Sequence, residues 1–341
     1  MNDFTTIEFP IDDIRFKTLA RDEDALAAIR EQSPEPCTPE KIKQAYGEVL
    51  FPPAPEDRPY TFASIVVSAD GKIAFPDDGH GELIAGNNFR DPKGALADFW
   101  VLNMLRFYAD GVVIGARTLQ TNEIMWANCF DAELAELRRS ALHKRHYCPS
   151  HVVVSFDGTD IPFDHMIFGI DAPLLLATSP EGMAHVQKHS DRPYTVLGPW
   201  KRVEDIDVSA LDGLLESAPQ KRVLIGTGEG NRPDSRVLLF VLKHLGMDRV
   251  LIESPSYMTY LMSMQSMDEM FINYSSVFAG GSVGLGGFLE FSVNDHPHSD
   301  FIQVNMHQTN FLATRQKLIY GLANPSQINI HTGKPVGEPS A

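Results

Sequence analysis

The stretch RPYTFASIVVSADGKIA, residues Arg58–Ala74, and the stretch LRFYADGVVIGART, residues Leu105–Thr118, decide the fold class of this chain. Each contains an apolar run typical of a buried strand, and polar residues or glycine follow that run directly. A helical pattern lies between them, which gives the order strand, helix, strand. Because open α/β sheets bind ligands at the carboxyl ends of their strands, this order predicts a ligand-binding α/β protein and favours an enzyme.

Further β-rich runs recur after Tyr60, and several alternate with helical patterns at about residues 93–108, 131–146, 234–246 and 256–265. Such alternation predicts a mainly parallel central sheet flanked by helices. The last three runs, EMFINY, FLEFSV and FIQVN, follow one another without helices. They predict antiparallel strands at one edge of the sheet.

Composition divides the chain into three parts. Residues 1–57 contain two helical patterns and Pro-rich breaks, and we interpret them as an extension that packs on the domain or on a partner subunit. Residues 58–322 form the α/β domain. Residues 323–341 are polar and rich in proline and glycine, which predicts a flexible tail.

Charge and cysteine content bound the class of protein. The formal net charge of -16 argues against binding to nucleic acid or to an anionic membrane, because both require a basic surface. No signal peptide and no apolar run of membrane-spanning length is present in the sequence. The three cysteines form no CxxC pair. We therefore expect a cytoplasmic protein.

The order and spacing of these motifs give a resemblance that covers residues 58–322. The opening RPY…SADGKIA, the LR…AD…IG…T stretch, the VVVS run and the IESPS–helix–DEM segment resemble the reductase domain of riboflavin biosynthesis. That family has a dihydrofolate-reductase-like fold and reduces a phosphorylated ribosylamino-pyrimidine with NADPH. The resemblance implies the same fold, NADPH as cofactor, a small-molecule substrate and a homodimer.

Residues at strand ends are the candidates for holding the cofactor. Gly115 allows close approach of the backbone to a ligand, Thr118 begins the following turn and Arg117 adds a positive charge. The remaining candidates, assigned by the resemblance, are Ser155 after the VVV run, Ser254 and Ser256 in the IESPS turn, and Gly280 and Gly281 in a later loop.

Other strand-end residues are candidates for the substrate. Ser68, Asp70 and Lys72 follow the first strand, although an Asp-Gly pair is also a common turn signal. The resemblance places Glu253 beside the pyrimidine, with a strand-end acid as the alternative, and it aligns Asn122 with an acidic residue of the family. We expect Asn122 and Glu253 to be catalytic and Trp126, with Met125, to line the substrate pocket.

Two departures from the family pattern keep the substrate open. Asn122 and Glu123 replace two aspartates, and the arginine that binds the substrate phosphate is absent from the stretch LQTNEIMWANC. Proline and serines replace the glycines of the IESPS turn, which removes a backbone donor. A pterin or folate reductase of the same fold and a catalytically silent binding or scaffold protein are the alternatives. We expect no metal, because the histidines and cysteines have no zinc-site spacing.

Overall fold

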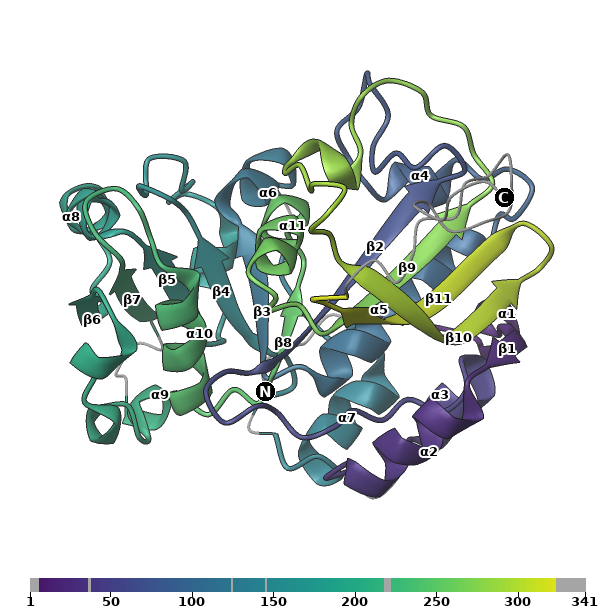
Figure 1. The fold of residues 1–341 in the computed structure, drawn as a ribbon, viewed down its shortest axis with the longest axis horizontal. Coiled ribbons are helices and arrows are strands. Elements are labelled where there is room, and N and C mark those ends of the chain that lie inside the picture. The colour runs from purple at the N-terminus through teal and green to yellow at the C-terminus, as the bar shows by residue number, and fades with distance from the viewer. Residues whose placement is uncertain (1–5, 36–37, 124, 145, 218–221, 323–341) are drawn as a thin grey trace, which may run out of the picture.

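A computed structural model describes residues 6–35, 38–123, 125–144, 146–217 and 222–322. Within those residues, the strands form one eleven-stranded sheet in the order β1-β10-β11-β9-β2-β8-β3-β4-β5-β7-β6 (Figure 1). The strands are β1 (Lys17–Arg21), β2 (Tyr60–Ser68), β3 (Gly111–Gly115), β4 (Ser150–Val154), β5 (Leu174–Thr178), β6 (Thr195–Trp200), β7 (Arg222–Thr227), β8 (Arg249–Ile252), β9 (Glu269–Ser275), β10 (His298–His307) and β11 (Phe311–Ile319).

Strand directions confirm the predicted class of fold. The strands from β9 to β6 in this order are all parallel to their neighbours, whereas β11, β10 and β1 are antiparallel at the other edge. One expected strand is wrong: FLEFSV lies in the loop between β9 and β10, where Phe288 and Val293 are exposed and have no sheet face to cover. The antiparallel partner of β9 is instead β11.

Helices cover both faces of the sheet. The face formed by Val112, Ile114 and their neighbours packs against α5 and α7, and the opposite face packs against α10 and α11. Asp131 and Asp234 cap α7 and α10 by accepting backbone N–H bonds, as expected for short polar residues at helix starts. The helices are α1 (Ile11–Ile14), α2 (Glu23–Gln32), α3 (Glu40–Ala45), α4 (Leu83–Gly86), α5 (Gly94–Tyr108), α6 (Ala116–Thr121), α7 (Ala132–Ser140), α8 (Pro180–His189), α9 (Leu214–Ser217), α10 (Ser235–His244) and α11 (Pro255–Ser263).

The described part of residues 1–57 is built into this core rather than lying apart from it. Strand β1 extends the sheet by pairing with β10, and α1 to α3 lie along the antiparallel edge (Figure 1). Phe16, Tyr46 and Phe51 are buried in the same apolar cluster as α5. The expected extension therefore packs on the domain. Residues 323–341, where we expect a flexible tail, lie outside the described residues.

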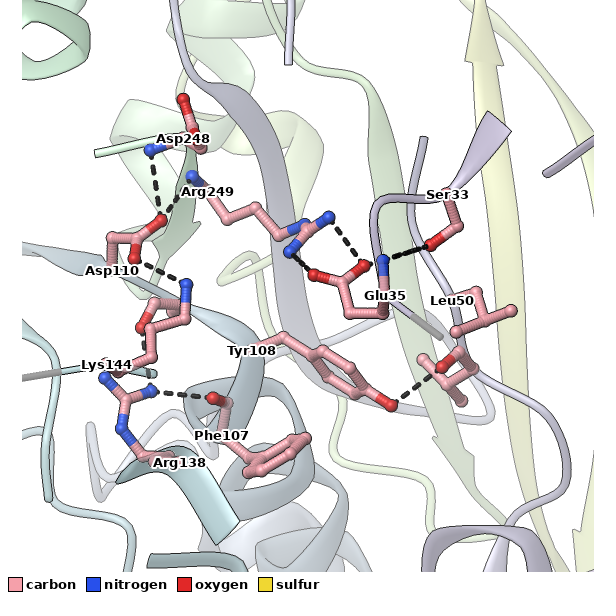
Figure 2. Close-up of polar contacts among 12 residues, drawn as sticks. Ser33, Glu35, Leu50, Phe107, Tyr108, Asp110, Arg138, Lys144, Asp248 and Arg249 are labelled. Atoms are coloured by element: carbon pink, nitrogen blue, oxygen red, sulfur yellow. Dashed lines mark hydrogen bonds and ion pairs between the residues drawn. The ribbon is translucent and has the colours of Figure 1, made fainter. Parts of the chain in front are cut away.

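A buried polar network ties that N-terminal segment to the amino ends of the strands (Figure 2). Arg249 at the start of β8 makes a two-pronged ion pair with Glu35, and both side chains are almost fully buried. Asp110 accepts the backbone N–H groups of Asp248 and Arg249, and the Tyr108 hydroxyl donates to the Val49 carbonyl. These contacts satisfy polar groups that would otherwise be buried without partners.

Candidate functional site

The candidate site lies where strand β8 ends early. Strand β8 pairs with β2 only over Tyr60–Ala63, although β2 continues to Ser68. Beyond Ala63, among the described residues, β2 has a strand partner only on the β9 side. Ser64 and Ile65 are partly exposed at this point, whereas the rest of β2 is buried. We call this gap beside β2, where Ser64 and Ile65 are partly exposed, the opening; it lies towards the carboxyl ends of the strands, where α/β proteins bind ligands.

Gly115, Thr118 and Ser254 form one wall of this opening. A side chain at Gly115 would place its Cβ 2.8 Å from the Ser254 Oγ and 3.6 Å from the Thr118 Oγ1. Gly115 precedes α6 and Ser254 precedes α11, and the Ser254 hydroxyl makes no capping hydrogen bond to its own helix. Ser256 is exposed in the first turn of α11, with its Oγ 3.5 Å from that of Ser254. The structure therefore brings four predicted cofactor residues together around a position that only glycine leaves open.

The turn after β2 and the loop after β9 form the opposite wall. The Ser68 hydroxyl donates to Asp70 and accepts the Lys72 N–H, which closes a tight turn with Gly71 at a φ of +74°. Asp70 also accepts the N–H groups of Ala279 and Gly280, at 3.1 and 2.8 Å. These hydrogen bonds lower the pKa of Asp70 to about 2, the Ser68 hydroxyl contributing most. Asp70 therefore ties the two loops together, which is the turn role left open by the sequence.

Lys72 and Gly281 complete this loop pair. Lys72 bridges to Gly284, so the lysine backbone is held against the loop after β9. Gly281 has a φ of +72°, and an added Cβ would lie 2.6 Å from the Pro76 Cγ. The loop glycines are thus required by backbone conformation and by close approach of the two loops.

Ser155 and Arg117 lie at the margin of the opening. Ser155 follows β4, where its hydroxyl donates to Asp160 and accepts the Gly158 N–H. That pattern makes Ser155 part of a turn. Arg117 is exposed on α6 and points away from the described core.

Two predicted site residues, Glu253 and Asn122, form hydrogen bonds with residues outside this grouping. Glu253 accepts two hydrogen bonds of 2.7 Å from the buried guanidinium of Arg106. Asn122 ends α6, donates from its side chain to the Thr118 carbonyl, and its own carbonyl contacts the His165 ring at 2.8 Å. Both side chains therefore form hydrogen bonds that stabilise the local structure.

Trp126 is the residue placed furthest from this grouping. Its ring stacks on His151 at 6.4 Å, near the amino end of β4. The carboxyl end of that strand, Val154, lies three residues or about 10 Å further along, from the rise of a strand per residue. Met125 packs against the apolar core.

Sequence reasoning missed Asp98, whose side chain faces the sheet from α5 and is hydrogen-bonded to β9. Its Oδ1 accepts a 2.6 Å hydrogen bond from the Nδ2 of Asn273 on β9. Burial raises the pKa of Asp98 to about 6, and the Asn273 hydrogen bond opposes this shift. The available signal was a single acid on the otherwise apolar stripe Gly94, Ala97, Val101 and Leu105, at helical spacing.

Two further kinds of feature are absent from the part of the chain that the structure describes. No group of three or more histidine, cysteine or acidic side chains there is arranged to hold a metal ion. No helix among the described residues is long and apolar enough to cross a membrane.

No protein family model and no curated protein matches this sequence. Its fold is similar to solved structures. A pyrimidine reductase-like protein from Corynebacterium diphtheriae aligns with a TM-score of 0.53 at 15% identity, over 78% of this chain and 94% of that one. RibD from Acinetobacter baumannii aligns with a TM-score of 0.51 at 15% identity, over 87% of this chain and 64% of that one.

A deaminase/5-amino-6-(5-phosphoribosylamino)uracil reductase from Thermotoga maritima aligns with a TM-score of 0.49 at 16% identity, over 77% of this chain and 57% of that one. The chain thus spans less than two thirds of the length of the Acinetobacter and Thermotoga proteins. At such identities the likeness concerns architecture. It confirms the expected fold class: this chain has the fold of the pyrimidine reductase-like and RibD proteins.

Proposed function

We propose that the protein is an NADPH-dependent reductase of a small heterocyclic substrate. The observation that supports this most is the grouping of Gly115, Thr118 and Ser254 at the ends of neighbouring strands, opposite the Ser68 turn. The grouping occurs on a fold that known pyrimidine reductases use. The reaction resembles the reduction of 5-amino-6-(5-phosphoribosylamino)uracil, and pterins are the second substrate class to test.

The chain offers a suitable place for the diphosphate of such a cofactor. Gly115 leaves space that any Cβ would fill, and the Ser254 hydroxyl faces that space. The first turn of α11 has unpaired backbone N–H groups as well, which favour an anion. Pro255 removes one of these donors, so the serine hydroxyls would supply part of the contact. When bound, the nicotinamide supplies a hydride.

The residues of the chain would then provide position and exclusion of water. Thr118 and Ser254 would hold the cofactor on the β3–β8 wall, and the joined loops at Asp70 and Gly280 would cover the substrate. Holding two reactants in a dry site accounts for a large part of the rate in this kind of transfer. We propose in addition that the active form is a cytoplasmic homodimer.

Replacement of Thr118 by tryptophan tests the cofactor site. The indole would enter the space beside Gly115, so the affinity for NADPH should fall at least tenfold in a fluorescence titration, while the melting temperature changes little. Thr18→Trp on the exposed strand β1 is the matched control. An unchanged dissociation constant in Thr118→Trp, or no NADPH binding by the wild type, would refute the proposed function.

A further inference from the structure

The carboxyl group of Asp98 and two buried oxygen atoms, Asn273 Oδ1 and Ser275 Oγ, lie on the α5 side of the sheet near the opening. Asp98 lies on the stripe of α5 that faces the sheet, and its side chain is partly exposed. Its hydrogen-bond partner Asn273 is fully buried on β9. A carboxyl group held against a sheet yet reached by solvent is placed to exchange protons with a ligand.

The amide partner and a neighbouring serine carry buried oxygen atoms without partners. Within the described ranges neither the Asn273 Oδ1 nor the Ser275 Oγ has a hydrogen-bond partner, and both residues are at most 1% exposed. They lie two positions apart on β9 and so share one face of the sheet. Because unpaired polar atoms are rare in folded interiors, these two oxygens indicate that polar groups of a ligand or of water belong beside them.

On this face of the sheet, Asn273 and Ser275 lie close to the opening beside β8. In the strand register Val66 is opposite Asn273 and Ser68 is opposite Ser275, so the two unpaired atoms lie beside the end of β2. Ser64, on the same face of β2, is the partly exposed residue next to the gap left by β8. A ligand entering there would meet Asp98, Asn273 and Ser275 on one side.

Among the described residues, no ion pair explains why an acidic side chain lies at the position of Asp98. The charged side chains on the surrounding elements are paired with one another, as Glu269 with Arg315, Asp91 with His307, Lys93 with Asp13 and Arg106 with Glu253. A paired structural role for Asp98, such as an ion pair across α5 and β9, is therefore not what the described residues show.

We propose that Asp98 is the proton donor of the reduction and that Asn273 positions its carboxyl group. This inference rests on the proposed function. The acceptor carbon of a C=N bond gains the hydride of the reduced cofactor, and the nitrogen takes the proton of Asp98, giving CH–NH. The oxidised cofactor and the Asp98 carboxylate remain, and solvent reprotonates the carboxylate through the opening.

The environment of Asp98 agrees with that role. Burial raises its pKa to about 6, so part of the population keeps its proton near neutral pH. A general acid works best when its pKa lies near the operating pH. The Asn273 N–H bond favours the ionised form, so it stabilises the carboxylate that remains after the transfer.

The test compares three variants with the wild type. NADPH titration should give Asp98→Asn the affinity of the wild type, because the side chain of Asp98 is hydrogen-bonded to Asn273 on β9 and is not among the atoms around Gly115. With 5-amino-6-(5-phosphoribosylamino)uracil as probe, the kcat of Asp98→Asn should fall about 100-fold or more, as expected for loss of a general acid. Asp24→Asn, on the exposed surface of α2, is the control and should leave kcat unchanged.

The pH profile separates a proton donor from a structural residue. In the wild type kcat should fall as pH rises through the Asp98 pKa, and Asp98→Asn should lack this fall. Asn273→Ala should move the fall to higher pH, because it removes a hydrogen bond that lowers the pKa. Carboxyl NMR of the chain without cofactor, assigned by Asp98→Asn, should show the same pKa and a shift when the probe is added.

The outcomes are distinguishable. Failure of the wild type to bind NADPH refutes the proposed function, and this inference with it. NADPH binding combined with an Asp98→Asn variant of unchanged kcat and pH profile refutes only this inference. If the probe is not reduced, a carboxyl signal that titrates as an ordinary aspartate and does not respond to the probe also refutes it, whereas a responding signal supports it.

Discussion

At the scale of single residues, the ionised form of Asp98 should lower the stability of the folded protein above the pKa of that carboxyl group. Its folded pKa is raised, so its contribution to the free energy of unfolding is fully present below the ordinary aspartate pKa and is lost as pH rises towards 6. Asp98→Asn should therefore stabilise the protein by about 2 kcal/mol above pH 7, after allowance for partial exposure, and by little at pH 4. Urea unfolding at a series of pH values measures this. A gain that does not vary with pH would contradict it.

Single residues also show what the sequence could predict of the site. The short motifs at Gly115–Thr118 and Ser254 each follow the end of a strand that can be recognised in the sequence. Because β3 and β8 are parallel neighbours, their register brings those two strand ends together. Glu253 and Asp98 differ, because their partners lie far away in the chain, at Arg106 and Asn273. Which acid is paired with a guanidinium and which is left with a raised pKa depends on these distant contacts, so the sequence alone could not distinguish the two.

At the scale of elements, the ion pair between Glu35 and Arg249 fastens the segment after α2 to strand β8. Glu35→Ala should cost about 3–5 kcal/mol of unfolding free energy, because it leaves a buried guanidinium without its partner. The double variant Glu35→Leu/Arg249→Met should recover much of that loss, since it removes both charges together. Chemical denaturation of the two single variants and the double variant measures the coupling. Additive effects would mean that the pair does not hold these elements together.

Element positions were predictable where periodicity and caps agree. The pattern at about residues 93–108 became α5. Those near 234 and 256 became α10 and α11, of which α10 starts after the capping residue Asp234 and α11 starts at Pro255. The antiparallel edge was less predictable. FLEFSV has the apolar content of a strand, but its flanks are rich in glycine. FLATRQKLI, which forms β11, contains charged residues that interrupt the apolar pattern of a strand. One of them, Arg315, is buried against Glu269.

At the scale of the whole molecule, residues 1–57 are part of the fold that carries the site. Besides burying Phe16, Tyr46 and Phe51, the segment supplies carbonyl groups to donors of the domain. Tyr108 and Arg315 donate to the Val49 and Leu50 carbonyls, and Gln303 and Asn305 both donate to that of Tyr46. Removal of this segment would leave those donors buried without acceptors or open the apolar cluster to water.

A chain of residues 58–341 should therefore fail to fold by itself. We expect no cooperative thermal transition and binding of a hydrophobic dye, because α5 and the sheet lose the cover of α1 to α3 and β1. The matched control lacks residues 323–341, which the sequence predicts to be a tail, and should melt like the full chain. Separately expressed residues 1–57 should restore the transition if the domain requires the hydrogen bonds accepted by the Tyr46, Val49 and Leu50 carbonyls. A truncated chain that melts cooperatively and binds NADPH would show that residues 58–322 form an autonomous domain.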